Sequence, residues 1–203
     1  RALNAPEARV PKNTAELYQM GVEQARKAHN RRALDLLKLG LEAHPNFPLA
    51  LSEMGVLYLK LKQPEKAAES LRASLKLSPE NHASLLAYGR VLLDLQRLSE
   101  SEEQFRRVLK GNSASPWAHF YLGVILLKRR EHEGAEIAFK SALSSGGDHL
   151  ALAHYYLGGL YWSKQQYRQA ADELEAYLRL TPGAPDAARL RQTIKEFREI
   201  FGL

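Results

Sequence analysis

The chain has 203 residues, of which 45% are hydrophobic and 26% charged, and its formal net charge is +6 at pH 7. Cysteine is absent, which excludes disulfides, thiolate metal sites and cysteine nucleophiles. No apolar stretch approaches the roughly 20 residues that a membrane-spanning helix needs, so the composition is that of an ordinary globular chain long enough for one or two domains.

The first segment, residues 1–13, carries two prolines and no helical period, so we expect an extended arm or linker. The chain begins with Arg1 rather than methionine. We therefore expect upstream sequence to have been removed, by processing or by the choice of fragment. The localisation stays open between a bacterial cytoplasm and the periplasm or another exported site.

After this arm, a glycine recurs at intervals of 34 or 35 residues, at Gly21, Gly55, Gly89, Gly123 and Gly158. Twelve residues after each glycine comes another small residue, at Ala33, Ala67, Ser101, Ala135 and Ala170. Small residues at a fixed phase allow two helix axes to approach at the short end of the usual spacing of about 8–10 Å. A constant period of this length predicts a solenoid of repeated helix pairs.

Local signals mark where several of these helices begin and end. Asn13 with Glu16, and Ser99 with Glu102, fit capping boxes. Ser115 followed by Pro116 fits the start of the fourth unit, and Asp148 is a candidate cap for the fifth. Prolines at 45 and 79 end the first two pairs, because proline cannot continue a helix.

A last helix is expected from Asp186 to about Phe201, with an apolar stripe of Leu190, Ile194, Phe197 and Phe201. No second helix follows it as a partner. We interpret it as a cap over the apolar end of the array. Because it is also basic, a role at a membrane surface is the alternative.

On these residues the chain resembles tetratricopeptide repeat proteins. The period, the apolar-x-x-Leu-Gly frame, the small residue twelve positions later and the closing proline all match that family. The resemblance implies an all-α, right-handed superhelical solenoid of about five repeats. Their expected ranges are 14–47, 48–81, 82–115, 116–149 and 151–184, with residues 185–203 forming the capping helix.

The chain departs from the family's pattern at two kinds of position. Leucine or histidine replaces the usual tryptophan, at Leu17, Leu51, Leu85, His119 and His154, and the closing proline is lost in the third and fourth repeats. The family's carboxylate clamp, which grips the acidic tails of chaperones, would fall on Tyr18, Val22, Glu53, Ala83 and Ala87. None of these side chains can act as a clamp, so we reject a chaperone-tail receptor.

For function, the resemblance implies a protein- or peptide-binding scaffold with a concave groove lined by the first helix of each repeat. On the first helix of each repeat, five positions share the face that would line this groove. Gly159 takes one of these positions in the fifth repeat. The candidate groove residues are Tyr18, Val22, Leu49, Val56, Leu86, Arg90, Trp117, Phe120, Val124, Leu127, Lys128, Leu152, Tyr155 and Trp162. An apolar, mildly cationic groove favours an amphipathic segment with acidic residues. Alternatively, the face fills the interior of the superhelix, or the chain's own arm covers it.

Other functions find less support in the sequence. The basic residues are scattered over different repeats, which disfavours nucleic-acid binding. His119 and His154 take the position of a buried tryptophan, so we interpret them as packing residues rather than metal ligands. No catalytic or phosphate-binding motif is present, and we expect neither enzyme activity nor a cofactor. The sequence predicts a non-enzymatic interaction scaffold; the alternative is the C-terminal array of a larger, bacterial multidomain protein whose upstream domain carries the activity.

Overall fold

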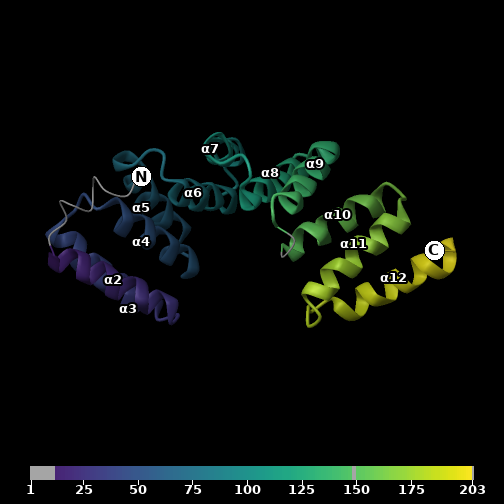
Figure 1. The fold of residues 1–203 in the computed structure, drawn as a ribbon, viewed down its shortest axis with the longest axis horizontal. Helices are drawn as coiled ribbons and strands as arrows, with labels where there is room; N and C mark the ends of the chain where they lie inside the picture. Colours follow the sequence, from purple (N-terminus) through teal and green to yellow (C-terminus); the bar gives the residue numbers. More distant parts are fainter. Residues whose placement is uncertain (1–11, 148–149, 203) are drawn as a thin grey trace. The chain divides into compact units, whose positions relative to one another are not determined.

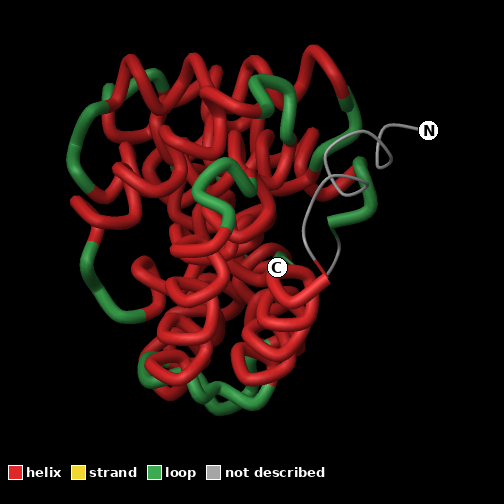
Figure 2. Tube along the Cα trace, turned by 90° about the vertical axis from the view of Figure 1, so that its left-hand side faces the viewer, coloured by secondary structure: helices red, strands yellow, loops and turns green. Residues whose placement is uncertain are grey.

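The computed structural model describes residues 12–147 and 150–202, and these residues form only helices and their connecting turns (Figures 1 and 2). Eleven helices occur in this described part of the chain. They form two compact units, which we call unit 1 and unit 2, and the chain passes from the first to the second after Gly111. The predicted all-α fold of paired helices is confirmed.

Unit 1 contains three helix pairs. They are α2 (Lys12–Arg26) with α3 (Asn30–Ala43), α4 (Pro48–Lys60) with α5 (Pro64–Leu77), and α6 (His82–Asp94) with α7 (Leu98–Gly111). Each pair is stacked on the next, because α3 packs against α4 and α5 packs against α6.

Unit 2 contains two helix pairs and a single last helix (Figure 1, green to yellow). They are α8 (Pro116–Lys128) with α9 (His132–Ser144), α10 (Ala151–Ser163) with α11 (Tyr167–Leu180), and α12 (Ala187–Phe201). The last helix packs against α11 and buries Leu190, Ile194 and Phe197 in the core of the unit. This is the capping role predicted for it.

The five periodic glycines lie where the two helices of each pair are in closest contact. An alanine Cβ at any of them would come within 3.0 Å of one side chain on the second helix. Those side chains are Leu37, Leu71, Phe105, Phe139 and Leu174, each sixteen residues after its glycine. The structure therefore confirms the steric reason for the period, since a larger residue would overpack the helix pair.

The turn within each pair has a second periodic feature, a non-glycine residue in the left-handed region of the backbone. These residues are Ala28, Lys62, Gln96, Arg130 and Gln165, with φ between 57° and 63°. In each case the next N–H donates to the carbonyl five residues earlier, as His29 does to Gln24 at 2.9 Å. These turns are Schellman motifs that satisfy the open carbonyls at the helix end.

The helix starts agree with the sequence in part. Ser115 caps α8 by accepting a hydrogen bond from the Ala118 N–H at 3.4 Å, as predicted. Ser99 lies in the first turn of α7 rather than before it, because the preceding turn places the helix start at Leu98. Asp148 and residues 1–11 of the expected arm lie outside the described residues, and the last two arm residues already belong to α2.

A chain of buried hydroxyls crosses unit 1. Ser84 of α6 donates to Ser52 of α4 at 2.8 Å, and the hydroxyls of Ser84 and Ser74 are 3.0 Å apart. Ser74 of α5 in turn donates to the Pro48 carbonyl at 2.8 Å. Because each buried hydroxyl has a partner, the network ties three helices together without leaving an unsatisfied polar group.

Candidate functional site

The fourteen predicted groove residues divide between the two units, with six on the first helices of unit 1 and eight on those of unit 2. In unit 1, Arg90 is exposed and the five others are half-buried. Tyr18, for example, packs its ring against Phe47 with centroids 5.2 Å apart. The apolar groove positions of unit 1 therefore offer little free apolar surface.

A hollow of about 530 Å³ in unit 1 is lined by both apolar and charged side chains. Its lining includes the cations Lys60, Lys62 and Arg90 and one carboxylate, Asp94. Unit 1 thus presents an excess of positive charge at these positions.

The corresponding positions of unit 2 differ in character. Three large apolar side chains on α8 and α10 are exposed, with Trp117 at 42%, Leu152 at 51% and Trp162 at 44%. Lys128, at the end of α8, is exposed as well. We use the name "unit 2 face" for the apolar groove residues here that are not buried, namely the exposed Trp117, Leu152 and Trp162 and the half-buried Val124, Leu127 and Tyr155.

Phe120 is the exception among the predicted residues of unit 2, because its side chain is only 5% exposed. Its ring packs against Phe139 with centroids 5.8 Å apart and against Tyr121 at 5.3 Å. The expectation that Phe120 presents an aromatic surface to a ligand is corrected: it is a core residue. Phe139, which covers its ring, belongs to α9, the second helix of the pair.

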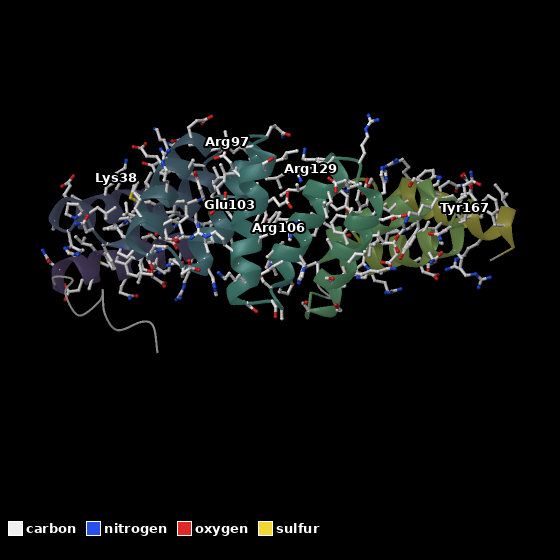
Figure 3. All side chains as sticks on the ribbon, turned by 90° about the horizontal axis from the view of Figure 1, so that it is seen from above. Lys38, Arg97, Glu103, Arg106, Arg129 and Tyr167 are labelled. Atoms are coloured by element: carbon white, nitrogen blue, oxygen red, sulfur yellow. The ribbon has the colours of Figure 1, made fainter. Side chains whose placement is uncertain are left out.

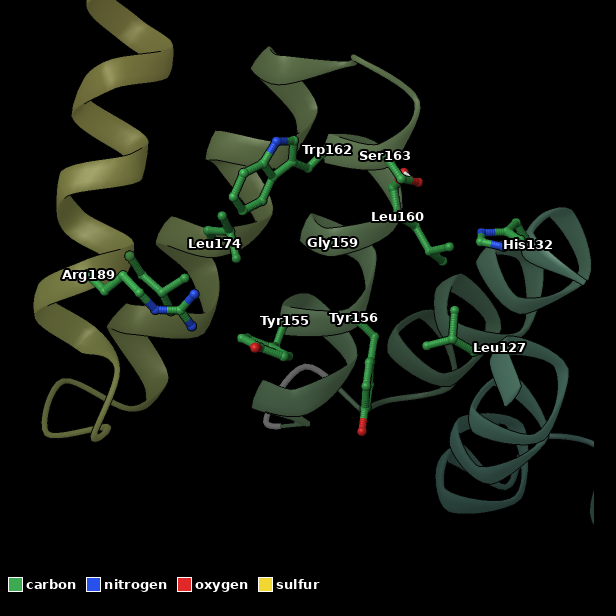
Figure 4. Close-up of a pocket in the computed structure, with 11 residues that line it drawn as sticks. Leu127, His132, Tyr155, Tyr156, Gly159, Leu160, Trp162, Ser163, Leu174 and Arg189 are labelled. Carbon is green, nitrogen blue, oxygen red and sulfur yellow. Dashed lines mark hydrogen bonds between the residues drawn. The ribbon is translucent and has the colours of Figure 1, made fainter. Parts of the chain in front are cut away.

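An apolar cavity of about 270 Å³ opens between α10 and its neighbours within unit 2 (Figure 4). It is lined by Leu127, His132, Tyr155, Tyr156, Gly159, Leu160, Trp162, Ser163, Leu174, Arg189 and Leu190. We call it the Gly159 pocket. Three residues of the unit 2 face take part in its wall, and α12 contributes Arg189 and Leu190.

The strongest charge cluster of unit 2 lies at Glu136 of α9. Its carboxylate accepts hydrogen bonds from Lys140 and Lys164, both at 2.6 Å, and from the Tyr161 hydroxyl at 3.2 Å. The two ammonium groups, Lys140 first, hold the pKa of Glu136 at about 2. The same contact raises the pKa of Lys140, and burial raises that of Tyr161. This cluster ties α9 to α10.

Unit 1 has comparable ion pairs at its surface, along α7 and the turn before it. Arg97 pairs with Glu100 and Arg106 pairs with Glu102, each at 2.6 Å, and both arginines are labelled in Figure 3. The Arg97 guanidinium lowers the pKa of Glu100, mainly through its hydrogen bond. Such exposed pairs contribute little to stability.

The two histidines considered as metal ligands have other partners. His154 Nδ1 lies 2.6 Å from a carboxylate oxygen of Glu173, and His119 Nε2 lies 2.9 Å from the Ser113 carbonyl. Within residues 12–147 and 150–202, no three side chains of the metal-ligating types come together. None of the helices in that same part of the chain combines the length and apolar character needed to cross a bilayer.

Comparison with protein families identifies the repeat. The tetratricopeptide repeat model matches residues 18–82, 52–116 and 86–149. The chain belongs to the tetratricopeptide repeat (TPR) family. A search of curated protein sequences found no match to this chain.

Several solved structures share the TPR fold at low sequence identity. PilF of Pseudomonas aeruginosa has a TM-score of 0.80 at 18% identity, covering 94% of this chain and 85% of that chain. PilW, a type IV pilus biogenesis factor, has a TM-score of 0.77 at 21% identity, covering 94% and 93%. YrrB has a TM-score of 0.66 at 20% identity, covering 87% and 90%. At these identities the likeness establishes the fold alone.

The TPR scaffold is generally a protein-interaction module, and the TPR proteins matched are typically non-enzymatic. In this TPR chain, sequence reasoning missed several residues of the Gly159 pocket, among them His132, Tyr156, Arg189 and Leu190. From the sequence, Arg189 is only one of the basic residues of the last helix. Its place at the pocket follows from how α12 packs on α11, which no spacing in the sequence specifies.

Proposed function

We propose that this TPR protein is a non-enzymatic interaction module that binds an amphipathic, acidic segment of a partner on the unit 2 face. The observation that carries this proposal is the exposure of Trp117, Leu152 and Trp162 on the first helices of two consecutive repeats. Large aromatic side chains of this kind usually supply most of the binding energy of a protein interface.

The sequences of α8 and α10 support the proposal. α10 has no Asp, Glu, Lys or Arg, and the only such residue of α8 is Lys128 at its end. A helix that is apolar nearly all round is expected to be buried on every side. Their partner helices α9 and α11 cover one side, so a bound segment is the natural cover for the other.

Charge favours an acidic ligand. The Gly159 pocket, which adjoins the unit 2 face, is lined by Arg189 and by no carboxylate. The groove positions of unit 1 add Lys60 and Arg90, and the whole chain carries a net charge of +6. A ligand with acidic residues would be attracted to both regions and would bind less tightly as salt is raised.

A likeness to another TPR protein agrees with this proposal. YrrB, which shares the fold, is described as a TPR protein with an unusual peptide-binding site. A peptide ligand is therefore compatible with this architecture, although the residues that would bind it here are this chain's own.

The test uses a displayed library of random peptides selected on the intact protein. We expect enriched peptides to combine apolar residues at helical spacing with Asp or Glu. The double variant Leu152→Asp, Trp162→Ala should bind them at least about tenfold more weakly, which corresponds to about 1.4 kcal/mol. Asp in the first turn of α10 is favourable for the helix, so the fold should persist.

The matched control is Ile137→Asp on α9, where an isoleucine is 66% exposed away from the groove positions. This variant should bind the selected peptides as the wild type does. Unchanged binding by the double variant, or an equal loss in the control, would exclude the unit 2 face as the binding site.

A further inference from the structure

Two adjacent glycines in the middle of α10 have opposite surroundings. A Cβ on Gly158 would lie 2.8 Å from two side-chain atoms of Leu174, so the helix pair requires a glycine there. A Cβ on Gly159 would meet nothing within 4 Å, and Gly159 is exposed. The packing argument that explains Gly158 therefore does not extend to its neighbour.

Gly159 also has no conformational reason to be glycine. It lies inside a continuous helix, Ala151–Ser163, and is not among the residues with positive φ. Glycine in a helix interior destabilises the helix relative to alanine or leucine, because it loses more backbone freedom on folding. Within the described part of the chain, nothing in the molecule's own packing benefits from the missing side chain.

What surrounds Gly159 is an empty apolar space. Tyr155 lies one turn before it and Trp162 about one turn after it, and both line the Gly159 pocket. Leu174 and Leu190, which are buried, form part of its lining from α11 and α12. At about 270 Å³, the cavity is just below the roughly 300–1,000 Å³ of pockets for small ligands. This size suits a single bulky side chain.

The positively charged side chain of Arg189 lies at the edge of the Gly159 pocket. Arg189 extends from α12 toward α10 in Figure 4, and its side chain is 67% exposed. Within the described residues its ion pair is a long one, 3.5 Å to a carboxylate oxygen of Asp186. The guanidinium is thus available to a carboxylate from outside, and it could hold such a group in a bidentate hydrogen bond.

We propose that the Gly159 pocket seats one aromatic side chain of the bound segment, and that Arg189 pairs with a carboxylate within about one helical turn of it. This inference rests on the proposed function and names the anchor of its ligand. The rings of Tyr155, Tyr156 and Trp162 favour an aromatic occupant, because aromatic pairs interact beyond their buried area. A glycine at position 159 then leaves the pocket open, because a side chain there would fill the space that the aromatic ring of the ligand occupies.

The first experiment measures Kd for one peptide selected from the random library on the wild-type protein. Gly159→Leu should bind it at least about tenfold more weakly while melting at the same or a higher temperature, since leucine favours the helix. Gly159→Ala should weaken peptide binding less than Gly159→Leu does. Gly183→Leu, which also adds a side chain in open space, is the control and should bind normally.

The second experiment changes the ligand. Replacing the aromatic residue of the peptide by alanine should weaken binding to the wild type about tenfold and have little further effect on Gly159→Leu. Arg189→Glu should weaken binding of the acidic peptide, and a peptide with Lys in place of its carboxylate should bind Arg189→Glu better than the wild type.

The outcomes separate the two proposals. If binding depends on Leu152 and Trp162 but is unchanged in Gly159→Leu, the unit 2 face stands and the anchor pocket is wrong. If binding depends on none of these residues, or if the library yields no binder, both are wrong. A lower melting temperature for Gly159→Leu would also overturn the inference, because the space would then belong to the protein's own packing.

Discussion

Unit 1 and unit 2 are built on the same repeat but use its first helices differently. One position shows the contrast, which is Tyr18, Ser52 and Leu86 in unit 1, and Phe120 and Tyr155 in unit 2. In unit 1 this position holds one aromatic ring, a buried hydroxyl and a half-buried leucine, whereas in unit 2 both of its residues belong to aromatic clusters. The periodic small residues are common to both units. The residues that lie between these small residues in the sequence decide which unit offers an apolar surface.

This comparison teaches that fold and function occupy different positions of the repeat. The periodic glycines are interchangeable in role, because each one faces a Leu or Phe of its partner helix. The groove positions are not interchangeable, since the position of Arg90 in unit 1 is taken in unit 2 by Val124 and Gly159. The variants below test this difference, beginning with the largest expected effect.

Deletion of residues 186–203 should affect unit 2 alone. The deletion removes α12, whose Leu190, Ile194 and Phe197 are buried in the unit 2 core. At about 1.5–3 kcal/mol for each large buried side chain, we expect unit 2 to lose about 5 kcal/mol or more. Hydrogen exchange should show α10 and α11 deprotected while α2–α7 remain protected.

The control for this deletion is Ile200→Ser, because Ile200 is the most exposed apolar residue of α12. It should leave the protection pattern unchanged. A truncated chain as stable as the full one would show that α12 is not a structural cap and is free for another role.

Alanine at equivalent positions of the two units sharpens the comparison. Phe120→Ala should destabilise by about 3–5 kcal/mol, because it empties a buried aromatic site. Leu86→Ala, at the half-buried equivalent, should lose about 1 kcal/mol. Urea unfolding of the two variants measures both values, and equal losses would contradict the different burial of this position in the two units.

The smallest expected effects are those of two glutamates, and the effect of Glu136 depends on pH. The pKa of Glu136 in the folded protein is about 2, below its ordinary 4.5, so its contribution is complete above pH 4.5 and is lost as pH falls toward 2. Glu136→Gln should destabilise by about 1 kcal/mol at neutral pH. The difference from wild type should shrink below pH 4.5.

The matched variant in unit 1 is Glu100→Gln, which removes the exposed pair with Arg97. It should change stability less than Glu136→Gln, because Glu136 has two lysines and a tyrosine as partners. A pH-independent effect of Glu136→Gln would show that packing rather than charge is responsible.

The fold could be predicted from the sequence because its determinants are periodic. The phase of Gly21 and Gly55 locates the tight helix contacts, and the stripe of Leu190 and Ile194 identifies the last helix. The left-handed turn residues could not be predicted, since Lys62 and its equivalents carry no glycine or asparagine to mark the conformation. At these positions the hydrogen bonds at the helix end impose the left-handed conformation, whereas in other turns a glycine or asparagine would mark it in the sequence.

The candidate site could be predicted only in outline. Helical phase places Trp117, Leu152 and Trp162 on the groove side, and the structure leaves these side chains exposed. The burial of Phe120 depends on Phe139 and Tyr156, which belong to other helices. The pocket beside Gly159 depends in the same way on the packing of α12, and contacts of this kind have no signature in the spacing of the chain.

Hydrogen exchange of the intact protein with and without a selected peptide tests the central claim most directly. If the unit 2 face binds the partner, the peptide should slow exchange in α8, in α10 and in the first turns of α12, and leave α2, α4 and α6 unchanged. A footprint confined to unit 1, or to the second helices α9 and α11, would contradict this account.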